Sequence, residues 1–283
     1  MASAQATGTT AHRGQDEHGT GARGRREGAP GQQPGRARDW AEIQERMLVP
    51  LYEAVYDRLE VGTATSVLGL GCRSGLALLL AAGRGAQVAG LEAEAELREL
   101  ARDRRLRVGE AGPGGAEDGA VPRTAYSLVT IFEQLPGAAE PQALVAEAAR
   151  RTHLGGHVVL AAWGPPERCE SAAVLDVARR RAGRTTARDP FALSRPGGLE
   201  DLLVGAGLRA AGSGRVSCPF AYADLDSAVR GLLSTGLYDA AAEFSGRSLV
   251  AKELEEVLQP YLLPGGAVRM ANVFRYVIAE QVR

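Results

Sequence analysis

A glycine-rich turn joins the first apolar strand that the sequence predicts to the helix after it. The stretch VLGLGCRSG at residues 67–75 supplies Gly69, Gly71 and Gly75. Glycines let a chain turn tightly and let a ligand approach main-chain N–H groups at a helix N-terminus. Glu92 ends the next predicted strand, about 20 residues on, where an acidic side chain accepts hydrogen bonds from ribose hydroxyls. Turn and acid together predict a nucleotide-type site, and the alternative is a plain tight turn beside a surface glutamate.

Alternating strands and helices are expected to position this turn and this acid. Apolar strand-type runs alternate with helical patterns from residue 65 to residue 163, which is typical of a parallel sheet covered on both faces. The predicted strands are 65–70, 86–92, 105–110, 126–132 and 157–163, and the predicted helices include 74–83, AEAELRELARDRR and PQALVAEAARRT. The sequence therefore predicts the α/β class.

The rest of the chain is expected to add a tail, cap helices and a helical insert. Residues 1–38 carry almost no large apolar side chain, so we predict a disordered, dispensable tail before one domain at 39–283. The next apolar residues keep helical spacing, and Pro50 breaks that run into two helices. Residues 219–263 are mostly helical and precede a last predicted strand at 268–281. We expect this insert to be a lid over the carboxyl edge of the sheet, where open α/β sheets bind ligands.

Composition and cysteine content restrict the partners and the compartment. The formal net charge of the 283 residues is −1, which argues against a dedicated nucleic-acid binder. Cys72, Cys169 and Cys218 are odd in number and lack metal-ligand spacing, so we expect reduced thiols and no metal site. No apolar run reaches membrane-spanning length, and the N-terminus lacks a signal-peptide core. We expect a cytoplasmic monomer or homodimer that acts on a small molecule and contacts no membrane.

One long stretch of the chain resembles a known enzyme family. VLGLGCRSGLALLLAAGRGAQVAGLEAEAELRELAR is similar to the first motif and second strand of class I S-adenosylmethionine-dependent methyltransferases, in particular bacterial small-molecule enzymes. The similarity continues through RVGE, SLVTIFEQ and ARRTHLGGHVVLAAWG into NVFRYVIAE, over residues 40–283. The resemblance implies an enzyme with a Rossmann-like sheet of seven strands, an antiparallel last strand and S-adenosylmethionine as cofactor.

The resemblance also implies a set of cofactor-binding positions. In the family, the methionine and ribose parts of the cofactor lie on the turn, and an acid at the position of Glu92 holds the ribose hydroxyls. Residues after the next two strands cap the adenine and pass beneath the methyl donor. The implied cofactor-binding residues are Gly69, Gly71, Cys72, Arg73, Gly75, Glu92, Ala93, Glu110, Ala111 and Phe132.

Two residues of the turn depart from the family pattern V-L-D-V-G-C-G-T-G. Gly69 replaces an acid that helps to bind the ammonium group of the cofactor, and Arg73 replaces a glycine that leaves room for the methionine part. Together they move the local formal charge by about two units toward positive, beside a ligand with a sulfonium and an ammonium. We therefore expect weakened or lost binding of S-adenosylmethionine, and a gain from Gly69→Asp with Arg73→Gly. The alternative is that Arg73 pairs with the methionine carboxylate or points into solvent.

Candidates for chemistry and for substrate contact cluster at the expected carboxyl edge of the sheet. Methyl transfer needs a nucleophile placed in line with the sulfonium carbon, and sometimes a base. Glu133 and Tyr52 are the candidate catalytic residues, and a surface acid is the alternative for Glu133. The candidate substrate-binding residues are Trp40, Tyr56, Gln134 and Trp163, with core packing as the alternative for the aromatic ones.

Three functions stay open, because one fold hosts many chemistries. The first is a tailoring enzyme of secondary metabolite or antibiotic biosynthesis, acting for example on a polyketide. It would transfer a methyl group from S-adenosylmethionine to O, N or C of a small molecule. The second keeps the fold but not the methyl donor, and catalyses nucleophilic coupling, cyclisation or another non-methylating step; Gly69 and Arg73 motivate it. The third is a non-catalytic binding protein.

Overall fold

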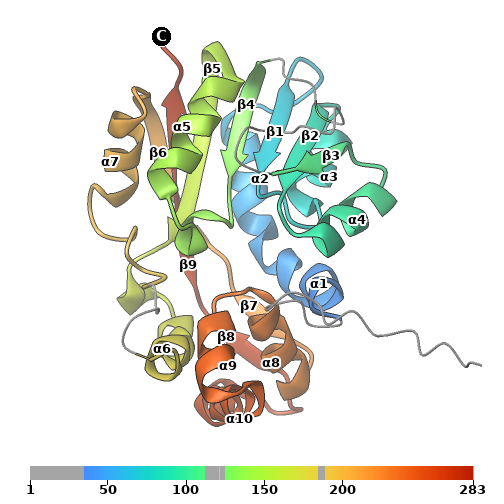
Figure 1. Cartoon of the computed structure of the whole chain (residues 1–283), viewed down its shortest axis with the longest axis vertical. Helices are drawn as coiled ribbons and strands as arrows, with labels where there is room; N and C mark the ends of the chain where they lie inside the picture. The colour runs from blue at the N-terminus through green and yellow to red at the C-terminus, as the bar shows by residue number, and fades with distance from the viewer. Residues whose placement is uncertain (1–34, 112–120, 122–124, 184–188, 283) are drawn as a thin grey trace, which may run out of the picture. The chain divides into compact units, whose positions relative to one another are not determined.

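The computed structural model describes most of the predicted domain (Figure 1). The described residues are 35–111, 121, 125–183 and 189–282. The expected tail falls, for residues 1–34, outside the described residues, and so does most of the segment between Glu110 and Tyr126. None of the described helices is long and apolar enough to cross a membrane.

Seven strands form one sheet in the order β3-β2-β1-β4-β5-β9-β6 (Figure 1). Strands β3, β2, β1, β4 and β5 run parallel to one another. Strand β9 runs antiparallel to both β5 and β6. The strands are β1 (Ser66–Leu70), β2 (Gln87–Glu92), β3 (Val108–Glu110), β4 (Tyr126–Ile131), β5 (Thr152–Trp163), β6 (Arg209–Ser217) and β9 (Val273–Glu280). This topology confirms the predicted α/β, Rossmann-like fold with an antiparallel last strand.

Helices cover both faces of the sheet. Successive strand residues point to opposite faces, so Val67 belongs to one apolar cluster and Leu68 to the other. The first cluster includes side chains of α2 (Val49–Arg58) and α3 (Leu76–Gly83), and the second includes α5 (Pro141–Arg151) and α7 (Gly198–Gly205). These long apolar strands are buried between two helical layers, as parallel strands usually are.

The N-terminal segment is a chain of short helices that differ in type. It contains α1 (Arg36–Asp39), a π-helix η1 (Trp40–Gln44), a 3-10 helix η2 (Glu45–Leu48) and then α2, whose first turn holds Pro50. Proline fits that first turn because its missing N–H would have no helical partner there. Helix α1 begins two residues before the predicted domain boundary at residue 38, and its Ala37 is buried against Trp40 and Leu97.

The insert is larger than the predicted lid and contains a small sheet of its own. It comprises β7 (Phe220–Tyr222), α8 (Leu225–Ser234), α9 (Asp239–Ser245), α10 (Arg247–Leu258), η5 (Gln259–Tyr261) and β8 (Val268–Met270). Strands β7 and β8 pair antiparallel, and α6 (Ser171–Arg181), which sequence reasoning missed, packs against α9 and α10. The prediction of a single last strand at 268–281 is wrong, because this segment forms two strands, β8 and β9, which belong to different sheets. The chain leaves one sheet and joins the other at Ala271 and Asn272, whose carbonyls accept hydrogen bonds from Glu170 and Cys218.

The short helix α1 leads to a testable correction about the tail. Arg36 pairs with Asp239 of the insert at 2.8 Å and with Glu94 at 3.4 Å. Removing residues 1–38 deletes these contacts and the buried Ala37. We therefore expect this truncated protein to melt several degrees below a protein that lacks only residues 1–34. Each kcal/mol of lost stability lowers the melting temperature of a domain of this size by about 2–4 °C. Thermal unfolding of both truncations, with full-length Arg36→Ala as control, measures this. Equal melting temperatures for the two truncations would show that α1 contributes nothing.

Candidate functional site

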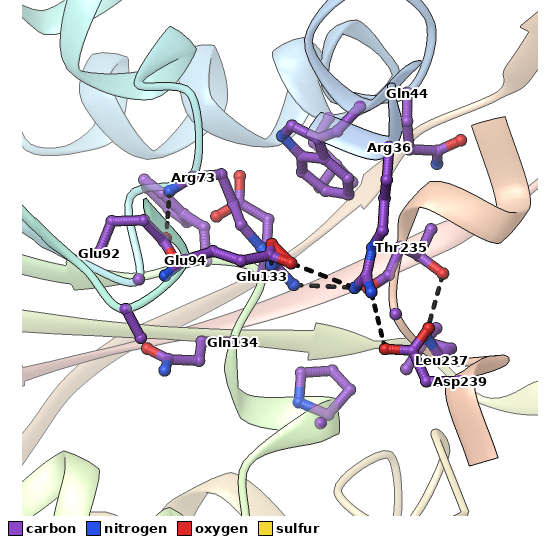
Figure 2. A pocket seen from close by; sticks show the side chains of 18 of the residues that line it. Arg36, Gln44, Arg73, Glu92, Glu94, Glu133, Gln134, Thr235, Leu237 and Asp239 are labelled. Atoms are coloured by element: carbon purple, nitrogen blue, oxygen red, sulfur yellow. Dashed lines mark hydrogen bonds and ion pairs between the residues drawn. The ribbon is translucent and has the colours of Figure 1, made fainter. Parts of the chain in front are cut away.

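A cavity of about 360 Å³ lies at the carboxyl edge of the parallel strands (Figure 2). Its walls come from the segments that follow β1, β2 and β4, from the end of β5, from the N-terminal helices and from the insert. The residues around it are Arg36, Trp40, Gln44, Leu48, Gly71, Arg73, Glu92, Ala93, Glu94, Phe132, Glu133, Gln134, Pro136, Gly137, Trp163, Phe220, Thr235, Gly236, Leu237, Asp239 and Phe274. Open α/β sheets bind ligands at this edge.

The glycine-rich turn forms one wall of this cavity and needs its glycines. Gly71 and Gly75 have positive φ of 65° and 88°, a conformation that costs glycine nothing. A Cβ atom at Gly71 would collide with the Gln134 side chain, and one at Gly75 with Leu106. The main chain therefore approaches Gln134 on one side of the turn and the protein core on the other.

A buried polar contact ties the turn to the N-terminal helices. Ser74 donates a hydrogen bond from Oγ to the buried Glu45 carboxylate of η2. Arg104 completes the contact, because Nη2 lies 2.6 Å from Glu45 Oε1 and Nη1 donates to the Ser74 carbonyl. The helices above the cavity and the turn beneath them are thus held as one unit.

Glu92 is the acid that the sequence analysis assigned to ribose binding, and the structure places it on the cavity wall. Its side chain is buried at the end of β2. Oε2 accepts a hydrogen bond from the Arg73 main-chain N–H at 2.8 Å, and Oε1 accepts one from the Glu94 N–H at 2.9 Å. These two hydrogen bonds fix the orientation of the carboxylate, and its oxygens keep further lone pairs that can accept hydrogen bonds from ligand hydroxyls.

Arg73 points neither into solvent nor out of the site. Its Nη1 lies 3.6 Å from Glu94 Oε2, its Nη2 donates to the Thr235 carbonyl at 3.4 Å, and its guanidinium lies 5.1 Å from the centre of the Trp40 ring. The charge that the sequence analysis expected to repel a cationic ligand is therefore paired. Among the described residues, four carboxyl groups and two guanidinium groups line the cavity. The local shift toward positive charge that Gly69 and Arg73 introduce therefore does not make the cavity as a whole positive.

A second arginine joins three separate parts of the chain at the cavity (Figure 2). Arg36 of α1 contacts Glu94, which precedes α4 (Ala95–Asp103), and Asp239, which begins α9. Its Nε also donates to the Ser234 carbonyl at 3.4 Å. Burial raises the pKa of Asp239, and the Arg36 charge opposes that rise. These pairs connect the insert to the sheet side of the cavity.

Glu133 and Tyr52, the two candidate catalytic residues, form a hydrogen-bonded pair. The Tyr52 hydroxyl donates a hydrogen bond to Glu133 Oε1. Glu133 lines the cavity, whereas Tyr52 does not. Burial raises the pKa of Glu133 to about 7, while the Tyr52 hydrogen bond and the Arg73 charge lower it. Burial also raises the pKa of Tyr52 well above its ordinary value, so Tyr52 stays a neutral donor. Glu133 is thus placed to accept a proton near neutral pH, and Tyr52 positions it.

The opposite end of the cavity is aromatic. Trp163 at the end of β5 lies 4.5 Å from the ring centre of Phe274 and 5.6 Å from that of Phe220. Phe220 and Phe274 come from strands β7 and β9, so this wall depends on the insert. Tilted and offset rings at such distances make a stable apolar surface.

Several residues that the sequence analysis assigned to the site lie elsewhere. Gly69 lies inside β1, the Cys72 side chain lies against Gly90 of β2, and Gly75 faces Leu106, so none of the three lines the cavity. The Tyr56 hydroxyl donates to the Ala77 carbonyl at 2.9 Å in the core, which replaces its expected substrate role with a packing role. Glu110 is exposed and pairs with Arg98, and Ala111, also off the cavity, adjoins residues outside the described part of the chain.

Of the expected site residues, Gly71, Arg73, Glu92, Ala93, Phe132, Glu133, Trp40, Gln134 and Trp163 do lie together around the cavity. Sequence reasoning missed the side chains contributed by the short N-terminal helices, the insert, the residue before α4 and strand β9. These are Arg36, Gln44, Leu48, Glu94, Phe220, Thr235, Leu237, Asp239 and Phe274. They carry no motif and lie up to about 240 positions apart, so no local pattern pointed to them.

Comparison with known proteins agrees with this architecture. Residues 68–160 match the family model of a methyltransferase domain. No curated protein matches the sequence significantly. Among solved structures, the chain is similar to a methyltransferase candidate from Bacillus halodurans, with 13% identity, 82% of this chain and 99% of that chain covered, and a TM-score of 0.53.

Two further structures share the fold. YcgJ of Bacillus subtilis is 12% identical, with 82% of this chain and 98% of that chain covered and a TM-score of 0.51. YjhP of Escherichia coli is 17% identical, with 86% and 98% covered and a TM-score of 0.50. At such identities the similarity establishes the arrangement of strands and helices and nothing about substrates.

Proposed function

We propose that this methyltransferase-family enzyme, with its class I domain at residues 68–160, methylates a small molecule in the cavity at the sheet edge. The observation that carries the proposal is that two carboxyl groups with different surroundings line this cavity. Glu92 accepts two main-chain hydrogen bonds, and burial raises the pKa of Glu133 to about 7. The first suits the ribose of a nucleoside cofactor, and the second suits removal of a proton from an acceptor.

The residues around the cavity fit S-adenosylmethionine, the cofactor that the family uses. Glu92 offers free lone pairs for the ribose hydroxyls, and both Glu92 and Gly71 line the cavity. The excess of carboxyl over guanidinium groups favours a ligand with a sulfonium and an ammonium. When bound, S-adenosylmethionine supplies an electrophilic methyl group.

The protein's own contribution is then binding, orientation and proton removal. Glu133 would take the proton of a hydroxyl or amine as that atom becomes the nucleophile, while Tyr52 keeps the carboxylate in place. The aromatic wall at Trp163 would hold an apolar substrate body, as a polyketide or another secondary metabolite could provide.

A specific observation favours a second function on the same site. The Gln134 side chain occupies the space next to Gly71, and Arg73 extends under Trp40, so both narrow the end where the methionine part would lie. If these side chains stay in place when a substrate binds, the enzyme would act without a methyl donor. Its reaction would then be a coupling or cyclisation in which Glu133 acts as the base.

Binding of S-adenosylmethionine to the whole protein distinguishes the two functions. Glu92→Gln should weaken binding about tenfold or more in calorimetry, because a charge-assisted hydrogen bond to the ribose is lost. Glu110→Gln is the matched control: the family pattern assigns this acid to the cofactor, but the structure places it outside the cavity and exposed. The control should bind like the wild type. Conversion of a substrate by wild type without S-adenosylmethionine would establish the second function instead.

A further inference from the structure

The π-helix η1 puts two side chains on the same face above the cavity. Trp40 and Gln44 are the first and last residues of this helix, and residues four positions apart lie on one face of a helix, so both line the cavity. Such π-segments occur often at functional sites. Trp40 is occupied by the Arg73 guanidinium that stacks on its ring. Gln44 is the side chain whose purpose remains to be explained.

The Gln44 amide is fixed at one end and unpaired at the other. Its Oε1 accepts a hydrogen bond of 2.9 Å from the hydroxyl of Tyr222, and both side chains are buried, with 3% and 2% exposed. Burial raises the pKa of Tyr222, so its hydroxyl remains a donor. With the amide oxygen held in this way, Nε2 is the free end. Within the described part of the chain, nothing accepts a hydrogen bond from Nε2. Because Gln44 lines the cavity, an oxygen atom of a bound ligand can accept a hydrogen bond from Nε2.

The surroundings of Gln44 decide the kind of molecule that would bring this oxygen. Tyr222 leads along β7 to Phe220, and Phe220 packs against Trp163 and Phe274. Leu48 lies one turn after Gln44, and Phe132 closes the floor. Flat aromatic side chains of this kind bind flat apolar ligands by offset stacking. Glu133 adjoins Phe132 and provides the proton acceptor.

We propose that this end of the cavity binds a planar aromatic molecule carrying a carbonyl oxygen in addition to the hydroxyl that is modified. Gln44 Nε2 donates to the carbonyl oxygen, and the aromatic wall stacks on the ring. Gln44 is therefore a positioning and specificity residue. The cavity of about 360 Å³ is near the lower limit for ligand pockets, roughly 300–1,000 Å³. Because it also has to admit the cofactor of the proposed function, it leaves room for no more than one or two fused rings. Binding of the ring and of the carbonyl does not depend on the proposed function. Only the modification of the hydroxyl rests on it.

The test uses two probes that differ only in the acceptor oxygen, 1-hydroxy-2-acetonaphthone and 2-ethyl-1-naphthol. Calorimetry with the full chain, without cofactor, should show the ketone binding about tenfold more tightly to the wild type. Gln44→Met keeps the length and packing of the side chain but removes the donor, so it should abolish this preference and leave the ethyl compound unaffected. Gln87→Met, at an exposed position at the start of β2 and outside the cavity, is the control and should retain the preference.

A second variant protects the test against loss of folding. Tyr222→Phe leaves Gln44 intact but frees its amide, so the preference for the ketone should fall severalfold. The proposal is overturned if the wild type binds neither probe, if it binds both equally, or if Gln44→Met keeps the preference. Because no S-adenosylmethionine is present, these outcomes do not depend on methyl transfer. A protein that prefers the ketone but never binds the cofactor would contradict the proposed function alone.

Discussion

Glu133→Gln is expected to lower the rate of methyl transfer by about 10²–10⁴-fold, the range that a positioned general base contributes. The amide keeps the size of the carboxyl and its contact with Tyr52, but it cannot accept a proton from the substrate. Transfer of a labelled methyl group from S-adenosylmethionine to an accepted hydroxy-aromatic substrate would measure the effect. An unchanged rate would remove Glu133 from the mechanism.

The pH profile provides the control for this prediction. Glu133 must be ionised to act, and its pKa is about 7, so the wild-type rate should rise with pH through 7 and level off above 8. The Tyr52 hydrogen bond lowers this pKa. In Tyr52→Phe the rise should therefore move to higher pH while the plateau rate is largely kept. A profile that does not move would show that Tyr52 only packs.

Glu133→Gln should also stabilise the folded protein above neutral pH. The pKa of Glu133 in the folded protein is raised from an ordinary 4.5, so the folded state binds this proton more tightly than the unfolded state. The resulting stability is fully present below pH 4.5 and is lost as the pH rises through 7. Since the carboxyl is only partly buried and faces the cavity, we expect Glu133→Gln to be more stable by about 2 kcal/mol at pH 8. At pH 4.5 the two proteins should melt alike.

Gly69→Asp is expected to destabilise the protein by about 2–4 kcal/mol rather than to restore cofactor binding. A Cβ at this position would lie 3.0 Å from the Cβ of Cys72 and 3.3 Å from Leu78, inside the packed region between β1 and α3. The carboxylate would enter an apolar space instead of the cavity. The motif comparison alone led to the opposite expectation, because it treats this position as part of the ligand site.

Denaturant unfolding of three variants separates the causes. Gly69→Ala carries the added Cβ without the charge, so it should cost only part of the loss, and the difference from Gly69→Asp gives the cost of the buried carboxylate. Arg73→Gly changes the other departing residue. It removes the pairing with Glu94 and the contact with Trp40, but adds no steric conflict. If Gly69→Asp proved as stable as the wild type and bound S-adenosylmethionine more tightly, the motif-based expectation would be correct.

The sequence by itself determined the sheet and the part of the site that adjoins it. Strands were predictable because buried parallel strands are continuous apolar runs such as SVLGL, bounded by glycines and polar residues. Glu92 and Glu133 were predictable because strand ends in a parallel sheet meet at one edge. These features depend on neighbours within a few positions, and a local pattern records them.

Only the tertiary structure decided the charge and the shape of the cavity. Arg73 looked like an unpaired cation in the sequence, and Glu94, Thr235 and Trp40 changed that by surrounding it. Arg36 looked like part of a tail until Asp239, about 200 residues later, came within 2.8 Å. Ion pairs and aromatic walls of this kind depend on which surfaces the insert brings together. Their partners have no fixed spacing along the chain, so no sequence period reveals them.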